Sequence, residues 1–295
     1  MVYFFGDFNK YIEYYKWYLL IKTLFTDRSS STREENLVIR FKNYVKAESL
    51  KEAYSLNQKK SSVIGAGMMW LKVQNRVKMT LIDLSGLGLD GIEETEDEFI
   101  IGAMCTLRQL EVHKGLDRYF PGLFKECTRS IVGVQFRNGA TAGGSIYGRF
   151  GFSDILTCML ALDSYVELYQ GGIIPLEQFC RQELNRDILV NIRIKKDGRR
   201  AAYTSSRLSK TDFPLIACCV SQKNGTYYVS VGARPARAEL YVISSKEAAG
   251  YEELAGIAAD RFQYGTNMRG SGEYRKHLAE VYIRRLFMAL DREEG

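Results

Sequence analysis

The sequence predicts an α+β protein, on two observations. The first half carries a β-α-β pattern in which a glycine-rich turn follows the end of a strand, the place where ligands bind in α/β sheets. The last third carries Asn224-Gly225, a strong hairpin signal, and then a helix over 279–290 whose apolar residues share one face. A small antiparallel sheet covered by helices is therefore expected from about residue 186 onward.

Composition limits the partners and sites that can be expected. The 295 residues carry a net charge of +6 without a block of five like charges, so nucleic-acid binding is not expected. The six cysteines form no Cys-x-x-Cys pair and lie mostly in apolar runs, which indicates reduced, buried thiols in a cytoplasmic protein and no metal site. His113 and His277 are far apart and are expected on helix surfaces rather than in a ligand set.

Residues 1–36 differ from the rest of the chain. Ten of the first 25 residues are aromatic, and Lys10, Glu13, Lys16 and Lys22 interrupt the apolar run. These charges argue against a membrane span, and the acid argues against a signal peptide. Two interpretations stay open: an interfacial helix, or a start codon assigned too early.

The β-α-β unit is expected from short apolar runs and one capping box. The capping box Ser49-Leu-Lys-Glu52 starts a helix that ends near Asn57. Strands are expected on either side, and the segment 65–71 is the glycine turn that follows the second of them. The expected strands are 38–41, 62–65 and 79–84.

A second glycine motif, Gly86-Leu-Gly-Leu-Asp-Gly91, has the letters of a G-x-G-x-x-G dinucleotide loop. That loop needs a helix directly after it, whose positive end faces the pyrophosphate. Here an acidic run over 92–98 and an apolar strand over 99–103 follow, and the acids would repel a diphosphate. The motif is therefore interpreted as a turn. The G-x-x-x-x-G-K-[ST] sequence of an ATP-binding loop does not occur either.

The remaining elements follow from capping boxes, apolar periodicity and turn residues. Between 106 and 180 the expected elements are a helix from the capping box at 106–109 to 114, helices over 121–131 and 154–163, a strand over 164–169 that ends at Gly171-Gly172, and a short helix over 175–180. Beyond that, the expected elements are strands over 188–194, 215–220 and 226–231, a turn at Asp197-Gly198, and helices over 247–263 and 279–290.

The stretch from Arg137 to Asp154 is unusually rich in glycine. Gly143-Gly144 after Thr141 gives consecutive amides without side chains, which can form a concave site for an anion. Ser153-Asp154 then starts a helix, with Asp154 expected to cap it. The alternative interpretation is a glycine-rich surface loop between two helices.

Several motifs resemble the flavin subunits of the molybdenum hydroxylases. Gly65-Ala-Gly-Met-Met-Trp-Leu71 resembles their first FAD pyrophosphate loop, and Arg137-Asn-Gly-Ala-Thr-Ala-Gly-Gly-Ser-Ile146 resembles the second. Asp154 falls at the family's aspartate. The segment 270–278 and Arg284-Arg285 are similar to the family's C-terminal signature. The resemblance covers about Val38 to Leu290.

The resemblance implies a domain plan and a set of FAD contacts. It implies a two-part FAD-binding domain of the PCMH type over 37–185, divided at 84/85, and a C-terminal α+β domain over 186–295 like that of the CO-dehydrogenase flavoprotein; residues 1–36 stand outside both. No catalytic residue and no metal ligand are implied. The FAD-contacting positions that it implies are Gly65, Ala66, Gly67, Met68, Met69, Trp70, Leu71, Thr141, Ala142, Gly143, Gly144, Ser145, Asp154 and Leu189.

The function implied is electron transfer in an enzyme of the xanthine dehydrogenase or CO dehydrogenase type. A small subunit with [2Fe–2S] clusters would pass electrons from a large molybdopterin subunit to FAD, and FAD would pass them to NAD or another acceptor. A membrane is not an expected partner. The alternatives are a stand-alone FAD oxidoreductase of the same fold superfamily and a non-catalytic membrane-associated protein.

The sequence also departs from the family pattern. Ser145 replaces the usual asparagine, and Met68-Met69 leave only backbone contacts in the first loop. Tyr147, Arg149, Phe150 and Phe152 stand where small residues and proline are common. An aromatic residue here could cover the isoalloxazine ring or pack under the loop, and both interpretations stay open.

Overall fold

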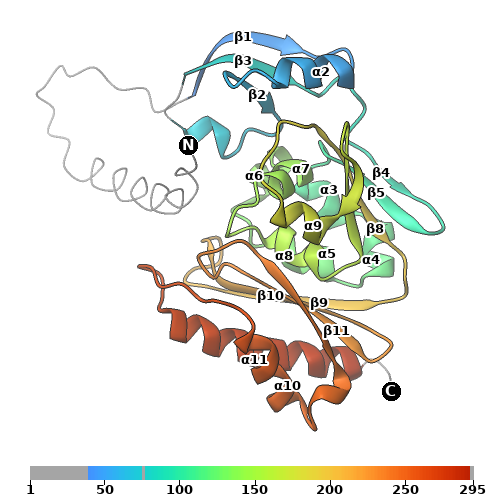
Figure 1. The fold of residues 1–295 in the computed structure, drawn as a ribbon, viewed down its shortest axis with the longest axis vertical. Coiled ribbons are helices and arrows are strands. Elements are labelled where there is room, and N and C mark those ends of the chain that lie inside the picture. The colour runs from blue at the N-terminus through green and yellow to red at the C-terminus, as the bar shows by residue number, and fades with distance from the viewer. Residues whose placement is uncertain (1–38, 75–76, 293–295) are drawn as a thin grey trace, which may run out of the picture. The chain divides into compact units, whose positions relative to one another are not determined.

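The computed structural model describes residues 39–74 and 77–292. The expectations for residues 1–36 therefore fall outside the described residues. The described chain contains three separate sheets with helices packed on them, so the α+β prediction is confirmed (Figure 1). Their strand orders are β1-β3-β2, β4-β5-β8-β6-β7 and β12-β11-β10-β9.

The first sheet is parallel, as the β-α-β pattern predicts. Ser49 caps α2, because its hydroxyl accepts the Glu52 amide at 3.2 Å. The helix connects β1 to β2, which are the two edge strands, and β3 lies between them and pairs with both in parallel. The elements are β1 (Arg40–Lys46), α2 (Leu50–Asn57), β2 (Ser62–Gly65), η1 (Leu71–Val73) and β3 (Val77–Asp83).

The second sheet is antiparallel, and its strands come from two stretches of the chain with short helices between them. Its strands are β4 (Ile92–Glu94), β5 (Glu98–Gly102), β6 (Ser164–Leu168), β7 (Gly172–Pro175) and β8 (Leu189–Lys195). The helices are α3 (Leu107–Val112), α4 (Lys114–Tyr119), α5 (Leu123–Thr128), α6 (Val134–Gly139), α7 (Ala142–Tyr147), α8 (Asp154–Leu160) and α9 (Leu176–Arg181). The motif at 86–91 is a turn before β4, as predicted.

The bounds of the helix expected over 121–131 are wrong. The helix found there is α5, which is shorter and begins only at Leu123, so that Pro121 precedes the helix instead of lying in its first turn. Gly122 is the N-cap of α5 with φ 68°, a left-handed conformation that glycine adopts without strain. The glycine-rich stretch is not one loop, because α6 and α7 occupy half of it.

The third sheet is the antiparallel sheet expected at the C-terminal end. Asn224 and Gly225 have φ of 50° and 72°, the two positive values of a tight hairpin turn. In Figure 1, α10 and α11 lie together on one face of this sheet. The elements are β9 (Arg200–Arg207), β10 (Pro214–Lys223), β11 (Thr226–Gly232), β12 (Glu239–Ser244), η2 (Ser245–Glu247), α10 (Tyr251–Asp260) and α11 (Gly272–Arg292).

Strand β8 changes the division of the chain. It lies between β5 and β6 and pairs antiparallel with both. A boundary at residue 186, as the sequence suggested, would separate this strand from its own sheet. We propose instead that the second part of the chain, which begins after β3, ends after β8 at Lys195 and that the C-terminal part begins at β9.

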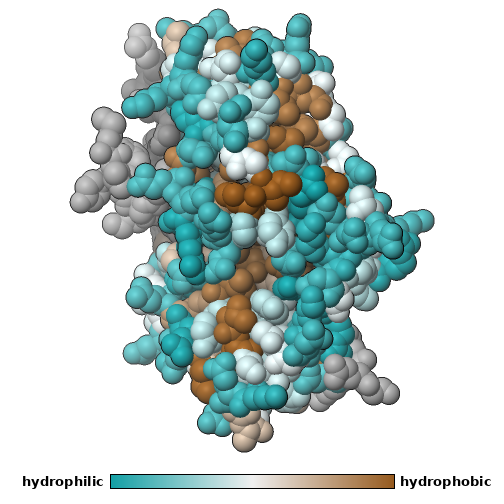
Figure 2. Space-filling view, turned by 45° about the vertical axis from the view of Figure 1, so that its right-hand side comes forward, coloured by the Kyte–Doolittle hydropathy of each residue, from teal (hydrophilic) through white to brown (hydrophobic). Residues whose placement is uncertain are grey.

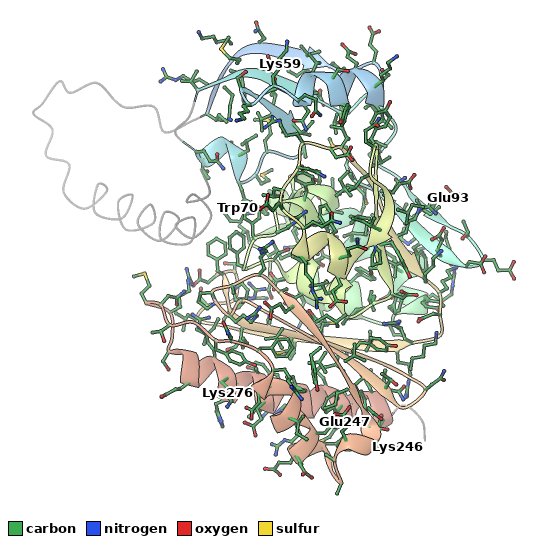
Figure 3. All side chains as sticks on the ribbon, in the orientation of Figure 1. Lys59, Trp70, Glu93, Lys246, Glu247 and Lys276 are labelled. Atoms are coloured by element: carbon green, nitrogen blue, oxygen red, sulfur yellow. The ribbon has the colours of Figure 1, made fainter. Side chains whose placement is uncertain are left out.

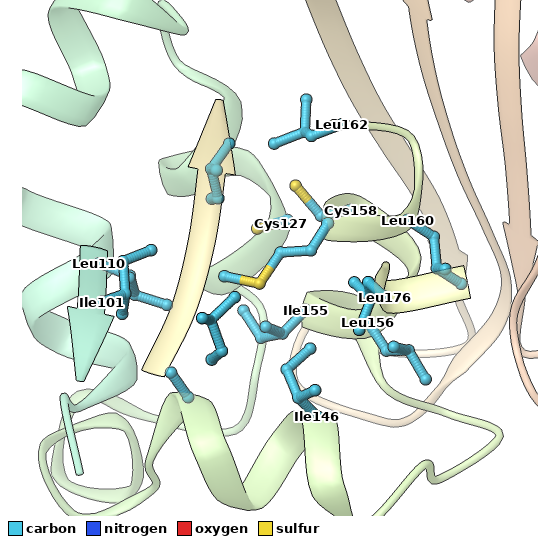
Figure 4. Close-up of a cluster of buried hydrophobic side chains, with 14 of the residues drawn as sticks. Ile101, Leu110, Cys127, Ile146, Ile155, Leu156, Cys158, Leu160, Leu162 and Leu176 are labelled. Carbon is cyan, nitrogen blue, oxygen red and sulfur yellow. The ribbon is translucent and has the colours of Figure 1, made fainter. Parts of the chain in front are cut away.

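The largest hydrophobic core joins the helices of the second part to the C-terminal sheet. Ile155 and Leu156 of α8 are buried in it (Figure 4). Met159 of the same helix and Cys219 of β10 belong to the same core. All six cysteines are free and buried, as predicted. Burial raises the pKa of the Cys105 thiol to about 12, which keeps it protonated and unreactive at neutral pH.

The surface of the molecule is mainly hydrophilic on the face that Figure 2 shows, with hydrophobic side chains gathered in separate patches. Within 39–74 and 77–292, the structure contains no helix that combines the length and the apolar character needed to cross a membrane.

Candidate functional site

The structure brings the two glycine motifs into direct contact. A Cβ atom added to Gly67 would lie only 1.5 Å from the carbonyl oxygen of Gly139, and one added to Gly139 would lie 2.0 Å from Cε of Met69. The turn that follows β2 therefore lies against the junction between α6 and α7. The backbone approach requires glycine at 67, because a Cβ atom there would meet backbone that cannot move aside, whereas at 139 the flexible end of the Met69 side chain would have to shift.

The first motif offers the free backbone amides of the site. Among the described residues, no acceptor pairs with the amides of Ala66, Gly67, Met68 or Met69. Met68 adopts a left-handed conformation with φ 55°, a strain of about 1–2 kcal/mol for a residue with a side chain. A left-handed residue within a run of free amides is the geometry of an anion-binding concavity.

The second motif does not form the open run of amides that the sequence suggested. Thr141 caps α7 by accepting the Gly144 amide on its hydroxyl at 3.1 Å. The Ala142 and Gly143 amides bond to carbonyl oxygens at 2.8 and 2.9 Å, on Cys105 and Ala103 respectively, and the Ser145 amide bonds to Thr141. The predicted nest is therefore absent here, because the amides hold α7 against the segment that follows β5.

Gly143 and Gly144 have different reasons to lack a side chain. A Cβ atom at Gly143 would lie 2.5 Å from the carbonyl oxygen of Ala103, so helix packing requires glycine there. Gly144 is exposed, and a Cβ atom would meet only the Thr141 hydroxyl, at 3.0 Å. Neither a positive φ nor a backbone contact requires glycine at 144, so this position leaves room for a group from outside the chain.

Asp154 is buried in a network that the C-terminal sheet completes. It is the first residue of α8, and Ser153 rather than Asp154 caps the helix by accepting the Leu156 amide at 3.1 Å. One oxygen of Asp154 accepts hydrogen bonds from the Tyr203 hydroxyl and from Arg207, the latter at 2.5 Å. Burial raises the pKa of Asp154, and the charge of Arg207 opposes that rise.

Sequence reasoning missed Tyr203 and Arg207. The two residues are four positions apart on β9, so both side chains point to the same face of the strand. Only this even spacing was visible in the sequence, and it does not indicate an aspartate at 154 as the partner. The buried Nε of Arg207 has no hydrogen-bond partner within the described part of the chain. A buried donor without an acceptor costs its desolvation energy.

A half-buried group of aromatic rings connects the two motifs with the C-terminal part. The Trp70 ring lies 5.2, 5.4 and 5.3 Å from the rings of Phe136, Phe152 and Phe213, measured between centroids. Phe150 stacks on Phe152 at 5.2 Å with an interplanar angle of 4°. Figure 3 labels Trp70 at the edge of the helices of the second part. The rings pack on one another and stay partly exposed.

The other residues singled out by the sequence lie elsewhere. The Tyr147 hydroxyl bonds to the carbonyl oxygen of Asn185, and the buried Arg149 guanidinium lies 3.9 Å from the centre of the Phe179 ring. Leu189 begins β8 with its side chain in the main core. Within the described ranges, His, Cys, Asp and Glu form no group that could hold a metal ion.

Arg137 of the second motif has a structural role. Its buried guanidinium bonds to Glu111 of α3 at 2.8 and 3.1 Å, and Arg108 pairs with the same carboxylate at 3.0 Å. Burial alone would raise the pKa of Glu111, but hydrogen bonds from the two arginines outweigh it and hold the pKa below its ordinary value. The pair fixes α6, and with it Gly139, against α3.

Glu111→Gln should destabilise the chain by about 3 kcal/mol at neutral pH, because the buried Arg137 charge loses its partner. The lowered pKa makes this stabilisation complete above the ordinary glutamate pKa of about 4.3 and removes it as the pH falls through the folded-state value. Urea unfolding of both proteins at pH 7 and at decreasing pH would measure it. A difference that does not shrink in acid would contradict this assignment.

Comparison with known proteins identifies relatives of this chain. A family model for the FAD-binding domain in molybdopterin dehydrogenase matches residues 39–194. The uncharacterized protein YgfM of Escherichia coli K12 is 24% identical over 212 residues, covering 71% of this chain and 80% of YgfM.

Solved structures of other proteins share the fold of this chain over most of its length. A chain of the Cu,Mo-CO dehydrogenase has a TM-score of 0.75 and 22% identity, with 85% of this chain and 97% of the other covered. A chain of quinoline 2-oxidoreductase from Pseudomonas putida 86 has a TM-score of 0.72 and 17% identity, with 87% and 97% covered. At these identities the likeness concerns the fold.

Proposed function

The chain belongs to the family of FAD-binding domains in molybdopterin dehydrogenases, and on this premise we propose that it is the FAD-carrying electron-transfer subunit of a molybdenum-dependent hydroxylase or dehydrogenase. FAD is the cofactor that the family binds. The observation that carries the proposal is the run of free amides from Ala66 to Met69, held against Gly139. A diphosphate needs several N–H donors, and this turn offers them without a lysine.

The proposal assigns residues to the diphosphate and to the flavin and ribityl portion of FAD. The amides of 66–69 donate to the diphosphate, and exposed Gly144 lets the phosphates approach α7. Arg207, whose guanidinium Asp154 holds in place, provides a positive charge near the flavin or ribityl portion. We retain the whole implied contact set, including backbone contacts at Leu189, as part of this proposal.

The aromatic group of Trp70, Phe152 and Phe213 suits the isoalloxazine ring. The three rings come from the first motif, from the segment after the second motif and from the loop before β10, and all are half-exposed. FAD, when bound, supplies the redox chemistry, so the chain needs no acid–base residue of its own. The protein orients the ring, excludes water from one face and places a positive charge nearby.

Trp70→Leu should make bound FAD clearly more fluorescent, because an indole in contact with the flavin ring quenches its emission. Emission of the holoprotein, compared at equal FAD occupancy, measures the effect. Tyr274→Leu removes an exposed aromatic side chain outside the group and should leave the emission unchanged. Equal emission from wild type and Trp70→Leu would mean that the rings only pack on one another.

The proposed electron path runs from a [2Fe–2S] subunit, fed by a molybdopterin subunit, through FAD to NAD or another acceptor in the cytoplasm. The test is anaerobic. Substrate of the molybdopterin subunit should bleach the flavin absorbance of the assembled three-subunit complex but not of the isolated chain. Bleaching of the isolated chain by an organic donor would favour a stand-alone oxidoreductase instead.

A further inference from the structure

Arg186 connects two parts of the chain that carry the proposed FAD contacts. Its guanidinium donates to the carbonyl oxygens of Asn57, Lys59 and Ser62, at 2.8 Å for Lys59 and 2.9 Å for Ser62. The side-chain amides of Asn57 and Gln58 donate back to the carbonyl oxygen of Arg186, at 2.8 and 3.0 Å. The bonds run in both directions between residues more than a hundred positions apart.

The carbonyl oxygens that accept from Arg186 lie between the end of α2 and the start of β2. Asn57 is the last residue of α2, and that helix has no basic residue in its last turn. Arg186 therefore supplies, from the second part, the positive charge that suits a helix C-terminus. Lys59 lies in the connection after α2, and Ser62 is the first residue of β2. The guanidinium thus fixes the start of the strand whose end is the turn of free amides.

The backbone of Arg186 is itself held firmly in the second part. The buried carboxylate of the next residue, Asp187, accepts the amides of Gln170, Gly171 and Ile188 between 2.8 and 3.2 Å. These bonds fix the segment to the turn between β6 and β7. Arg186 therefore extends from a hydrogen-bonded segment, three residues before Leu189, to the strand that leads into the first motif.

The apolar part of the same contact is small and lies next to the arginine. Ile188 and Val190 share a buried cluster with Ala53 of α2 and Ile82 of β3. Such contacts are not directional, so they bring the surfaces together without fixing a rotation. The planar guanidinium, with several hydrogen bonds to carbonyl oxygens in fixed positions, supplies the directional part.

We propose that Arg186 is a positioning residue for the cofactor. It sets the distance and angle between the free amides of 66–69 and the FAD contacts on the second part of the chain. It would not touch FAD itself. The inference rests on the proposed placement of the FAD diphosphate at the first motif. FAD spans the two parts, so a looser connection weakens binding even when every contacting residue is intact.

The test uses the full chain and the variants Arg186→Gln and Arg186→Lys. Titration of apoprotein with FAD, well below the unfolding temperature, should show at least about tenfold weaker binding for Arg186→Gln, the loss expected from a few charge-assisted hydrogen bonds. Arg186→Lys keeps the charge without the planar geometry and should also bind more weakly. Arg181→Gln, which removes an exposed arginine paired with Glu177, is the matched control and should bind like wild type.

Hydrogen exchange of the apoproteins supplies a readout that general destabilisation would not give. Exchange should rise over 59–70 in both Arg186 variants and stay unchanged over β10 and β11. Equal FAD affinity in wild type and Arg186→Gln, or a rise in exchange spread evenly over the chain, would overturn the proposal. If wild type itself binds no FAD, the proposed function fails, whereas the exchange pattern still decides whether Arg186 holds the turn.

Discussion

Gly144→Val is expected to abolish FAD binding while the chain keeps its fold. Gly144 is exposed in the first turn of α7, and on the protein side a new Cβ meets only the Thr141 hydroxyl at 3.0 Å, which can shift slightly. A β-branched side chain fills the space left for the phosphates and separates them from the donors of the first motif. Loss of several hydrogen bonds to a charged group, at about 1.5–3 kcal/mol each, weakens binding by about 100-fold or more.

Flavin content after purification and an FAD titration measure this effect, and circular dichroism checks the fold. Gly91→Val is the matched control, because a Cβ atom at this exposed turn glycine meets no atom within 4 Å. The control should bind FAD like wild type. Normal flavin content in Gly144→Val would show that the surface at Gly144 does not face the cofactor.

Gly67→Ala should also eliminate FAD binding, but through the backbone. The added methyl carbon would lie 1.5 Å from the carbonyl oxygen of Gly139, and neither atom belongs to a side chain that can rotate away. The turn must move away from the α6–α7 junction, at a strain of about 1–3 kcal/mol. The free amides of 66–69 then no longer face the FAD contacts on the second part of the chain.

The neighbouring glycine provides the control for this effect. A Cβ atom at Gly65 would lie 2.6 Å from Cδ1 of Leu81, the flexible end of a side chain, and so Gly65→Ala should retain most FAD affinity. Isothermal titration with FAD and thermal unfolding of both variants would separate the cases. Full affinity in Gly67→Ala would mean that contact between the two motifs is not needed for binding.

The sequence predicted those elements whose signals are local. Neighbouring residues determine the Ser49 cap, the β-α-β unit and the hairpin at Asn224-Gly225. The structure confirms each of these predictions. The start of α5 at Leu123 instead of Pro121 depends on one positive φ at Gly122. The place of β8 between β5 and β6 is a long-range pairing, which no local pattern records.

Long-range contacts also limit how much of the candidate site could be predicted from the sequence. The contact of the two glycine motifs agrees with their joint assignment to one ligand, although the ligand contacts remain a prediction. The loss of the nest after Thr141 could not be predicted, because the acceptors on Ala103 and Cys105 lie nearly forty residues earlier. The partners of Asp154 lie about fifty residues later on β9, and a buried ion pair leaves no local signal.

The measurement that most directly tests the central claim is the affinity of the apoprotein for FAD compared with riboflavin. The claim is that the free amides of 66–69 hold the diphosphate, which riboflavin lacks. FAD should bind at least about 1,000-fold more tightly, equal to about 4 kcal/mol from the diphosphate and adenosine portions. Equal affinity for riboflavin and FAD would contradict the claim and place the binding energy in the aromatic rings alone.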